Sequence, residues 1–332
     1  MATDPISTGL PMATPSEDDR ADLKPIDAPG AGDVSADGAM VDRESVDQPL
    51  HEARSQPRQH RAVRAGRNLP AAVAVGVVLG VGLVLIPIYT VPRVFLAIIA
   101  LAMVAAVWEI STALRTKAIA PPFLPLAAGA VGCVVGAYAA QEEGLLVAYV
   151  LTALAVIVWR MTEGAPGFLR DVSAGVFVAT YIPLLAGFAA LMVMEDQGAD
   201  RILAFILTTV CSDVGGYAAG VLFGKHPMAP TISPKKSWEG FGGSLLFCAV
   251  SGALTFDILL GADWWKGVIF GLVICVSATL GDLGESMIKR DLGVKDMGRL
   301  LPGHGGLMDR LDSLLPTAPV AWLLLSLFVP GG

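Results

Sequence analysis

Charged residues are scarce in this sequence, and their scarcity excludes several classes of protein. Only 16% of the 332 residues are Asp, Glu, Lys or Arg, whereas 54% are hydrophobic. The segment 1–67 holds 12 of the 30 acids and 8 of the 23 bases, so the segment 68–332 carries only 18 acids and 15 bases. This composition is not that of an ordinary soluble domain. Because no broad basic surface remains, we expect no nucleic-acid partner.

Cysteine is also rare, with four residues in the chain, and the positions of these cysteines argue against a disulfide framework. The four cysteines lie in apolar stretches without a CxxC pair: Cys133, Cys211, Cys248 and Cys275. Buried cysteines of this kind behave as small hydrophobic residues. We therefore expect four free thiols that bind no metal.

The N-terminal segment, 1–67, lacks hydrophobic periodicity. Residues 1–50 are rich in Asp, Pro, Ala, Gly and Ser, a composition typical of disorder. Five arginines follow between residues 51 and 67, directly before the first apolar run. Basic residues at that position are typical of a cytoplasmic juxtamembrane anchor. We predict a disordered cytoplasmic tail over 1–67 and a membrane domain over 68–332.

Apolar runs long enough to cross a bilayer fill the rest of the chain. We expect about nine transmembrane helices, and hence an all-α, polytopic integral membrane protein. Their predicted positions are 69–89, 94–114, 121–140, 145–161, 173–194, 202–223, 241–260, 265–281 and 313–330.

The distribution of Lys and Arg predicts the orientation of these helices. With the N-terminus inside, the inner segments near the membrane hold 17 cations and the outer loops hold three, Arg93, Arg201 and Lys266. Such a bias indicates which side is cytoplasmic. We expect a multi-pass protein of the cell's inner (plasma) membrane, with a polar cavity that opens to the cytoplasm.

One third of the charged residues of segment 68–332 lie in one stretch, residues 281–312. Six carboxylates and five cations crowd into this stretch, around a Pro-Gly-His-Gly-Gly turn. Dense charge beside apolar helices usually marks a site. Carboxylates suit a hard cation such as Mg²⁺ together with substrate phosphates, and interleaved Lys and Arg suit phosphate oxygens. This layout favours phosphoryl or nucleotidyl transfer over a solvated loop of surface ion pairs.

The spacing within this stretch is helical. Four polar residues follow one another at i, i+3, i+4 and i+7, and therefore share one helix face: Asp282, Glu285, Ser286 and Lys289. After the turn, Asp309 and Asp312 share a face of the next helix. Of the turn residues, His304 has two plausible roles, orienting a phosphate or shaping the turn. General base is the weaker role, because a phosphate monoester is already anionic near neutral pH.

Two carboxylates lie inside other predicted spans. Asp213 is in mid-span, where a carboxylate indicates either a metal or substrate site or a helix–helix polar contact. Glycines 216, 220 and 224 repeat every four residues and predict close approach of a neighbouring backbone. For Glu109, near the inner end of the second span, we expect a side chain that reaches the membrane surface.

The loop before the seventh span carries a second basic element. Lys235 and Lys236 lie beside the hydroxyls of Ser233 and Ser237, just before a Gly-rich helix start. This arrangement predicts a cradle for a triphosphate, although a lone Lys pair could also be only a topology signal. Glu239 is expected to cap the following helix.

The two polar blocks resemble one known family. Residues 286–312 match the pattern S-x-x-K-R-x4-K-D-x5-P-G-H-G-G-x-x-D-R-x-D, and residues 233–240 match S-P-K-K-S-x-E-G. Both patterns are similar to those of phosphatidate cytidylyltransferases, also called CDP-diacylglycerol synthases. The Asp at 213 stands in the D-x-G-G/A context of the same family, and Met297 is a mild departure where the family often has an aromatic residue.

The resemblance implies the reaction CTP + phosphatidate → CDP-diacylglycerol + pyrophosphate, with Mg²⁺ as cofactor. It implies a catalytic group of Asp213, Asp282, Glu285, His304 and Asp309, with Asp282, Asp309 and Asp312 as metal ligands. It also implies substrate-binding positions, which are Ser233, Lys235, Lys236, Ser286, Lys289, Arg290, Lys295, Asp296 and Arg310. A homodimer and a monovalent cation beside Mg²⁺ are suggested as well, although no residue pattern here indicates either.

Other readings of the same residues remain open. A CTP-dependent lipid kinase or a cytidylyltransferase for another lipid phosphate would use similar groups. An ion-coupled transporter also uses intramembrane carboxylates and Gly-broken helices, but here charge is concentrated at one membrane face and no inverted repeat is evident. A CDP-alcohol phosphotransferase would need a D-G-x-x-A-R element, which the sequence lacks.

Overall fold

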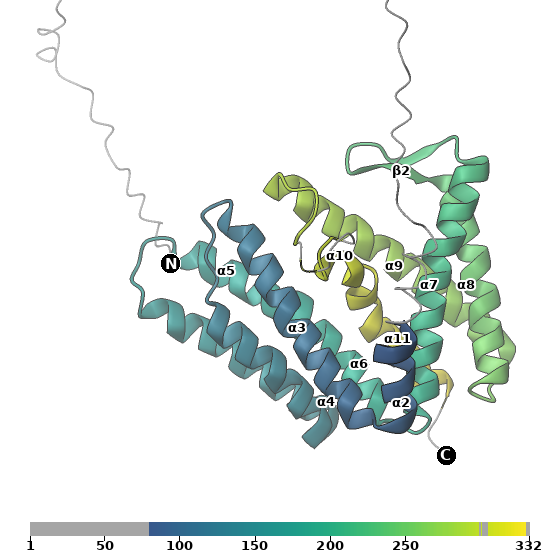
Figure 1. Ribbon diagram of the computed structural model, residues 1–332, viewed down its shortest axis with the longest axis horizontal. Helices are drawn as coiled ribbons and strands as arrows, with labels where there is room; N and C mark the ends of the chain where they lie inside the picture. The colour runs from purple at the N-terminus through teal and green to yellow at the C-terminus, as the bar shows by residue number, and fades with distance from the viewer. Residues whose placement is uncertain (1–79, 299, 301–304, 330–332) are drawn as a thin grey trace, which may run out of the picture. The chain divides into compact units, whose positions relative to one another are not determined.

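A computed structural model describes residues 80–298, 300 and 305–329, and these form an almost entirely helical protein (Figure 1). The predicted tail over 1–67 and the turn residue His304 lie outside the described residues. In chain order the elements are η2 (Gly80–Leu85), α2 (Ile86–Thr90), α3 (Pro92–Arg115), α4 (Phe123–Met161), α5 (Phe168–Ala179), η3 (Thr180–Leu184), α6 (Leu185–Met194), α7 (Gly198–Phe223), β1 (Pro227–Ala229), β2 (Ser233–Ser237), α8 (Trp238–Ile258), α9 (Trp264–Leu292), α10 (Met308–Leu311) and α11 (Leu314–Phe328).

Seven helical segments in the described part of the chain are long and apolar enough to cross a membrane. They confirm the predicted all-α, multi-pass architecture, but not the predicted count of nine. The first predicted span, 69–89, lies mostly outside the described residues. The third and fourth predicted spans, 121–140 and 145–161, both fall within α4.

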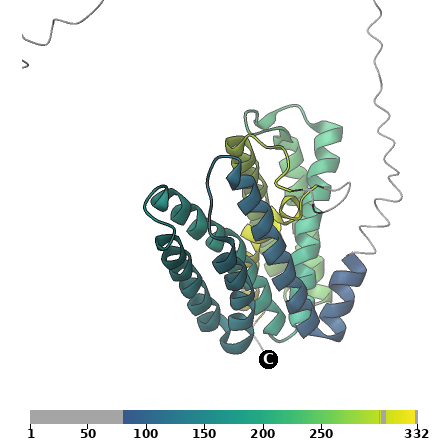
Figure 2. The ribbon, with the colours of Figure 1, turned by 60° about the vertical axis from the view of Figure 1, so that its left-hand side comes forward.

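Helix α4 accounts for two spans because its backbone reverses direction. Ala140 and Gln141 leave the helical conformation, and Gln141 has a positive φ of 49°. The arm before this point and the arm after it run side by side (Figure 2). They are so close that a Cβ on Gly136 would collide with the carbonyl oxygen of Gly144. A single straight helix of 39 residues would be about 58 Å long, roughly twice the hydrocarbon core. Each arm of the hairpin is long enough to cross the hydrocarbon core once, so α4 can account for two of the predicted spans.

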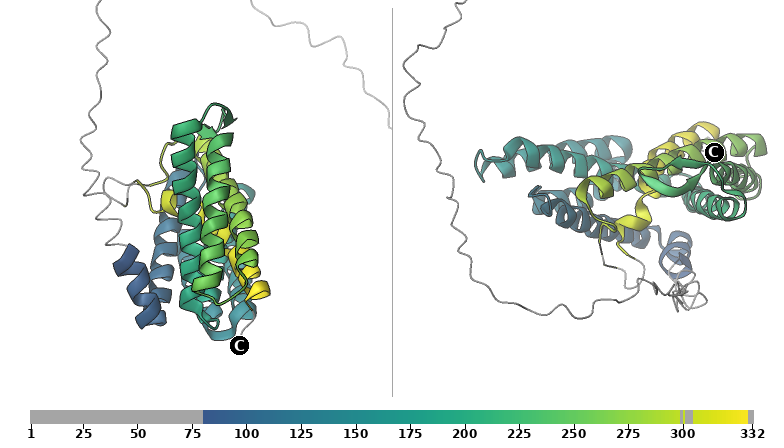
Figure 3. Two further views of the ribbon diagram at one scale, coloured as in Figure 1. Left: turned by 90° about the vertical axis from the view of Figure 1, so that its right-hand side faces the viewer. Right: turned by 90° about the horizontal axis from the view of Figure 1, so that it is seen from above.

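Helices α7, α8 and α9 form a tightly packed group that carries the candidate site (Figure 3). Helix α8 packs against both neighbours, and small residues line these contacts. Across the α7–α8 contact, a Cβ on Gly243 would lie 2.6 Å from the carbonyl oxygen of Gly215. Across the α8–α9 contact, a Cβ on Gly252 would collide with the carbonyl oxygen of Gly267. Close backbone approach through small residues is how membrane helices usually pack.

The buried core continues through α3, α6 and α11. Helix α11 packs against α9 and α6, and α3, α6 and α11 contribute Val107, Met192 and Leu325 to the core at 0% exposure. All four cysteines are free; Cys133, Cys248 and Cys275 are buried as predicted, whereas Cys211 is partly exposed. Between α5 and α6, the π-helical turn η3 contains Pro183, a residue that cannot donate a helical hydrogen bond.

Candidate active site

A polar cavity of about 300 Å³ lies where α7, the β1–β2 hairpin, α8 and α9 meet. It brings together residues that are far apart in the sequence, including five predicted site residues. Those five are Asp213, Ser233, Lys235, Lys236 and Asp282. The cavity therefore has a cationic wall from the hairpin and acidic groups from two helices.

The hairpin delivers the two lysines to the start of α8. Strands β1 and β2 pair antiparallel, and β2 ends at Ser237, whose Oγ accepts a hydrogen bond from the Gly240 amide at 3.1 Å. Ser237 is thus the N-cap of α8 and fixes where the helix begins. The main-chain oxygen of Ile232 accepts a bond from Arg290 Nε at 3.3 Å, which ties the hairpin to α9. The helix dipole at this end, together with Lys235 and Lys236, favours an anion.

Glu239 and His226 stabilise the base of the hairpin. Glu239 lies in the first turn of α8 and accepts bonds from the amides of Lys225 and His226 at 3.1 and 3.2 Å. Its Oε1 also lies 2.5 Å from His226 Nδ1. The N-cap of α8 is thus Ser237 and not Glu239 as predicted; Glu239 lies in the first turn and binds the preceding loop.

Asp213 is placed at the cavity by the packing of α7 against α8. The glycine repeat on α7 faces α8, as predicted: a Cβ on Gly216 would lie 2.5 Å from Ser244 Oγ. Beside it, Ser244 Oγ donates to the carbonyl oxygen of Ser212 at 2.6 Å. Asp213 itself lines the cavity with an exposed side chain. This position favours a binding role over a helix–helix contact.

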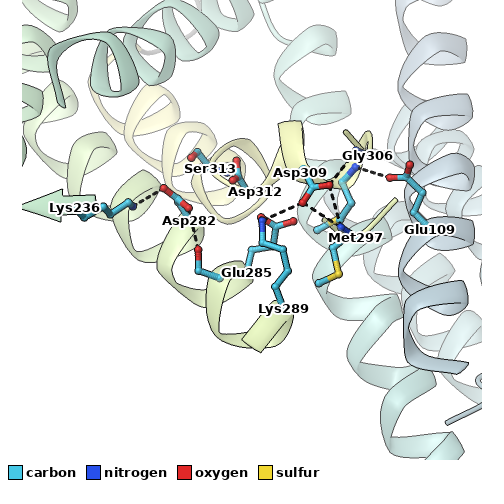
Figure 4. A network of polar contacts seen from close by, with 12 residues as sticks. Glu109, Lys236, Asp282, Glu285, Lys289, Met297, Gly306, Asp309, Asp312 and Ser313 are labelled. Atoms are coloured by element: carbon cyan, nitrogen blue, oxygen red, sulfur yellow. Dashed lines mark hydrogen bonds and ion pairs between the residues drawn. The ribbon is translucent and has the colours of Figure 1, made fainter. Parts of the chain in front are cut away.

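The predicted polar face of α9 extends from the cavity to the turn before α10 (Figure 4). Lys236 Nζ forms an ion pair with Asp282 at 2.5 Å, and Ser286 Oγ donates to Asp282 at 3.4 Å. One helical turn further, Lys289 Nζ bridges Glu285 at 2.8 Å and Asp309 at 3.0 Å. The two sequence blocks therefore form one charged network.

Asp309 organises the chain between α9 and α10. It accepts hydrogen bonds from the amides of Met297 and Gly306, each at 3.0 Å, besides the bond from Lys289. Gly306 leaves no room for a side chain, because a Cβ would lie 2.8 Å from Asp309 Oδ2. Three donors thus hold the Asp309 carboxylate at the end of the network.

Glu109 holds the same segment from the opposite side, and here the expectation from the sequence is wrong. Its side chain does not reach the membrane surface: Glu109 is 1% exposed. It accepts hydrogen bonds from the Leu300 amide at 3.3 Å and from the Met308 amide at 2.8 Å. A Cβ on Gly298 would collide with Oε1. The buried carboxylate therefore accepts hydrogen bonds from the main chain before α10 and at its first residue.

Further carboxylates gather near the cavity. Asp213, Asp282 and Asp312 lie close enough to interact electrostatically with one another. Asp312 also accepts a hydrogen bond from the Ser313 amide at 2.7 Å. Within the described ranges, no three His, Cys, Asp or Glu side chains are arranged to hold a metal ion by themselves. A hard cation here would need substrate oxygens as additional ligands, which is the usual manner of Mg²⁺ binding.

The remaining predicted residues are distributed more widely. Lys295 and Asp296 are exposed and do not line the cavity. Arg310 lies near enough to Asp213 for electrostatic interaction. The cavity also contains polar residues that the sequence did not single out, Ser212, Tyr217, Ser244 and Thr279. Hydroxyl side chains are common in membrane helices, so these residues gave no recognisable signal.

Comparison with known proteins gives a consistent result. A family model described as the cytidylyltransferase family matches residues 71–328. A protein of Mycobacterium bovis named phosphatidate cytidylyltransferase is 45% identical over 296 residues, which cover 85% of this chain and 96% of that protein. The proteins of that name from Mycobacterium tuberculosis and Mycobacterium leprae are also 45% identical, over 85% and 80% of this chain and 89% of each relative.

Proposed function

The chain belongs to the cytidylyltransferase family, and we propose that it transfers the cytidylyl group of CTP to phosphatidate. The products are CDP-diacylglycerol and pyrophosphate. The observation that carries the proposal is the cavity itself, which is lined both by Lys235 and Lys236 and by Asp213 and Asp282. Cations for phosphate groups and carboxylates for a metal ion meet there, within a protein built of membrane-spanning helices.

The cationic wall would bind the triphosphate of CTP. Lys235, Lys236 and the hydroxyl of Ser233 face the cavity beside the first turn of α8. Lysine and a helix N-terminus both favour phosphate oxygens. Lys236 already pairs with Asp282, so phosphate binding would draw the lysine away from this carboxylate.

In the reaction, an oxygen of the lipid phosphate attacks the α-phosphorus of CTP in line. One P–O bond forms, and the bond from the α-phosphorus to the pyrophosphate leaving group breaks. The attacking phosphate is already anionic, so no protein nucleophile is required. The protein supplies orientation and charge neutralisation, which provide most of the catalysis in such transfers.

The carboxylates fit a Mg²⁺ cofactor. Asp282, with Asp213 and Asp312 nearby, would hold the ion together with phosphate oxygens. When bound, Mg²⁺ would neutralise charge on the leaving pyrophosphate. The predicted roles of Glu285 and Asp309 are less direct, because Lys289 bridges the two carboxylates. Asp309 remains a proposed ligand that would have to exchange a present hydrogen-bond donor for the ion.

The phosphate of the lipid would meet the cations beyond the cavity. Lys289, Arg290, Lys295 and Arg310 divide between this phosphate and the nucleotide in our proposal, and Ser286 and Asp296 assist them. His304 is proposed to orient a phosphate. The acyl chains would remain in the bilayer, and the lipid would approach the site through a lateral opening between helices.

We further propose that the cavity opens to the cytoplasm from the cell's inner membrane, and that the protein forms a homodimer. Support for the orientation comes from contacts between predicted inner segments. Glu109, near the end of α3, accepts bonds from the amides of Leu300 and Met308, and Asp171 accepts a bond from the Ala120 amide at 3.1 Å. The loops that follow α3 and α4 and the charged stretch after α9 thus belong to one end of the bundle.

Pyrophosphate release by the purified protein in detergent tests the function. We expect release only when CTP, Mg²⁺ and phosphatidate are all present, with CDP-diacylglycerol in the organic phase. Asp282→Asn should lower turnover by ~100-fold or more, since a charge-stabilising group is lost. Its unfolding temperature should remain near that of the wild type. Release of CDP with a polyprenol would instead identify a kinase, and full activity of Asp282→Asn would remove Asp282 as a metal ligand.

A further inference from the structure

A second polar pocket, of about 390 Å³, lies at the opposite end of the helices from the candidate active site. It is formed where α7 and α9 begin and where α11 ends. Its polar lining residues are Asp196, Gln197, Arg201, Asp263 and Lys266. On α7, Arg201 precedes Asp213 by 12 residues, or about 18 Å of helix. Figure 1 shows β2, beside the first cavity, at the other end of α7 and α8. The two pockets are therefore distinct.

Arg201 is the unusual residue of this pocket. The side chain is 1% exposed, and two of its nitrogens donate to backbone carbonyls, Nε to Asp196 at 2.9 Å and Nη2 to Val329 at 2.5 Å. The third nitrogen, Nη1, is buried and has no hydrogen-bond partner. None of the ion pairs among the described residues involves Arg201. A buried guanidinium without a counter-charge is costly, so this geometry calls for an anion.

Among the described residues, none of the neighbouring carboxylates forms an ion pair with Arg201. Lys266 pairs with Asp263 at 2.9 Å, and Asp200 accepts a bond from the Tyr89 hydroxyl at 2.6 Å. Asp196 lines the pocket but offers Arg201 its main-chain oxygen. The N-termini of α7 and α9 add partial positive charge at this end. An incoming anion would thus meet Arg201 Nη1 and two helix N-termini, with Lys266 at the rim.

Two exposed tryptophans indicate where this pocket lies relative to the bilayer. Trp264 and Trp265 begin α9, directly after Asp263, and are 61% and 49% exposed. Lys266 Nζ lies 5.7 Å from the centroid of the Trp265 ring. Tryptophan and lysine at the end of a membrane helix are typical of the interface, where lipid headgroups lie. The anion most abundant at that depth is the phosphate of a phospholipid.

We infer that this pocket binds the phosphate group of a phospholipid headgroup, at the membrane face opposite the active site. Arg201 is the principal ligand and Lys266 the second. The bound phosphate links the start of α7, the α8–α9 turn and the end of α11, all of which contribute to the pocket. Its binding should therefore stabilise the fold without entering the reaction. This inference does not depend on the proposed enzymatic function.

The test measures lipid-dependent stability of the full chain. The purified, delipidated protein is titrated in detergent with phosphatidylglycerol, with phosphatidylcholine or with inorganic phosphate, and its unfolding temperature is followed by tryptophan fluorescence. Because a ligand that binds only the folded state stabilises it, we expect phosphatidylglycerol to raise this temperature by several degrees. Most of the rise should be lost in Arg201→Gln and in Lys266→Gln.

Two controls make the result specific. Arg93→Gln removes an arginine outside the pocket, which lies 5.9 Å from the Tyr138 ring centroid, and should keep the full rise. Arg290→Gln, which removes one of the cations proposed for the lipid phosphate at the active site, should also keep it, which excludes lipid binding at the active site as the cause. If Arg201→Gln does not fold, Lys266→Gln decides, since that side chain is 28% exposed at the rim. A full rise in both pocket variants, or an equal rise with inorganic phosphate alone, would overturn the assignment of a lipid headgroup.

Discussion

At the scale of single residues, the ion pair between Lys236 and Asp282 couples the two halves of the candidate site. Both side chains are partly exposed, at 25% and 30%, so the pair itself adds little to stability. The ion pair instead positions the two side chains: Lys236 and Asp282 hold each other at the cavity before a substrate binds. A nucleotide phosphate and a metal ion could then replace the two partners of this pair without moving the backbone.

Lys235 provides the first test at this scale. Lys235→Ala removes a cation that lines the cavity but forms no ion pair among the described side chains. A charged hydrogen bond contributes about 1.5–3 kcal/mol, so we expect KM for CTP to rise about 10-fold or more, with a smaller change for phosphatidate. Steady-state kinetics with each substrate varied in turn would measure this. Equal changes for both substrates would contradict a role at the triphosphate.

Glu109 provides the second test. Glu109→Gln keeps one oxygen but turns an amide donor toward a backbone N–H, so one buried donor loses its partner. The loss should cost about 1–3 kcal/mol of unfolding free energy and reduce turnover, because the segment that presents Asp309 loosens. Thermal unfolding and pyrophosphate release would be measured together. Glu163→Gln, at an exposed position of the 162–167 loop, is a matched control that should change neither.

Residue identity alone explains why Asp213, Lys235 and Asp282 could be predicted and Glu109 could not. Charged groups at a cavity stand out against an apolar sequence, and the spacing of Asp282, Glu285 and Lys289 already indicates their shared helix face. Glu109 binds the main-chain amides of Leu300 and Met308, which any residue would supply. A contact of this kind cannot be predicted from the residue types of the two partners.

At the scale of secondary structure, hydropathy predicts which segments are helical better than it predicts where they end. The eighth span was predicted to end at residue 281, but α9 continues to Leu292. Its last turns are charged because they face the protein's own cations and carboxylates instead of lipid. Similarly, α5 begins at Phe168, ahead of the predicted start at residue 173. Its first turn contains the charged residue Asp171, which hydropathy places outside a span but which is buried in an ion pair with Arg160 at 3.1 Å.

The α7–α8 contact can be tested with neighbouring glycines of α8. A Cβ on Gly243 would collide with Ala219 Cβ and lie 2.6 Å from the Gly215 carbonyl oxygen, whereas a Cβ on Gly242 would meet nothing within 4 Å. We expect Gly243→Ala to lower the free energy of unfolding by about 1–3 kcal/mol through overpacking. Displacement of α7 should also reduce turnover, since Asp213 is on α7.

Gly242→Ala is the control for helix propensity, because both positions lie within the same helix. Alanine at an open helical position should be neutral or stabilising by up to ~1 kcal/mol. Thermal unfolding of the two variants in one detergent would separate the effects. Equal stability of the two variants would show that the helices do not meet as closely as the structure places them.

At the scale of the whole molecule, the charge pattern and the structure divide the loops in the same way. Helices α7 and α8 run in opposite directions between the two pockets, so the hairpin lies at one end and the α8–α9 turn at the other. The sequence predicts an inner end with many cations and an outer end with few. What it could not predict is which inner loops contact one another, because those contacts form only after the helices pack.

The orientation of the membrane domain is testable with single cysteines. In a parent protein with Cys211→Ser, the other native thiols are buried and should not react. Lys225→Cys would mark the hairpin end and Glu142→Cys the turn of α4, both at exposed positions. Because cations accumulate on the cytoplasmic side, a membrane-impermeant maleimide added to intact cells should label Glu142→Cys, and Lys225→Cys only after permeabilisation. The unsubstituted parent controls for background. Labelling of Lys225→Cys in intact cells would place the cavity on the outer face, away from cytoplasmic CTP, and would contradict the proposed reaction as well as the topology.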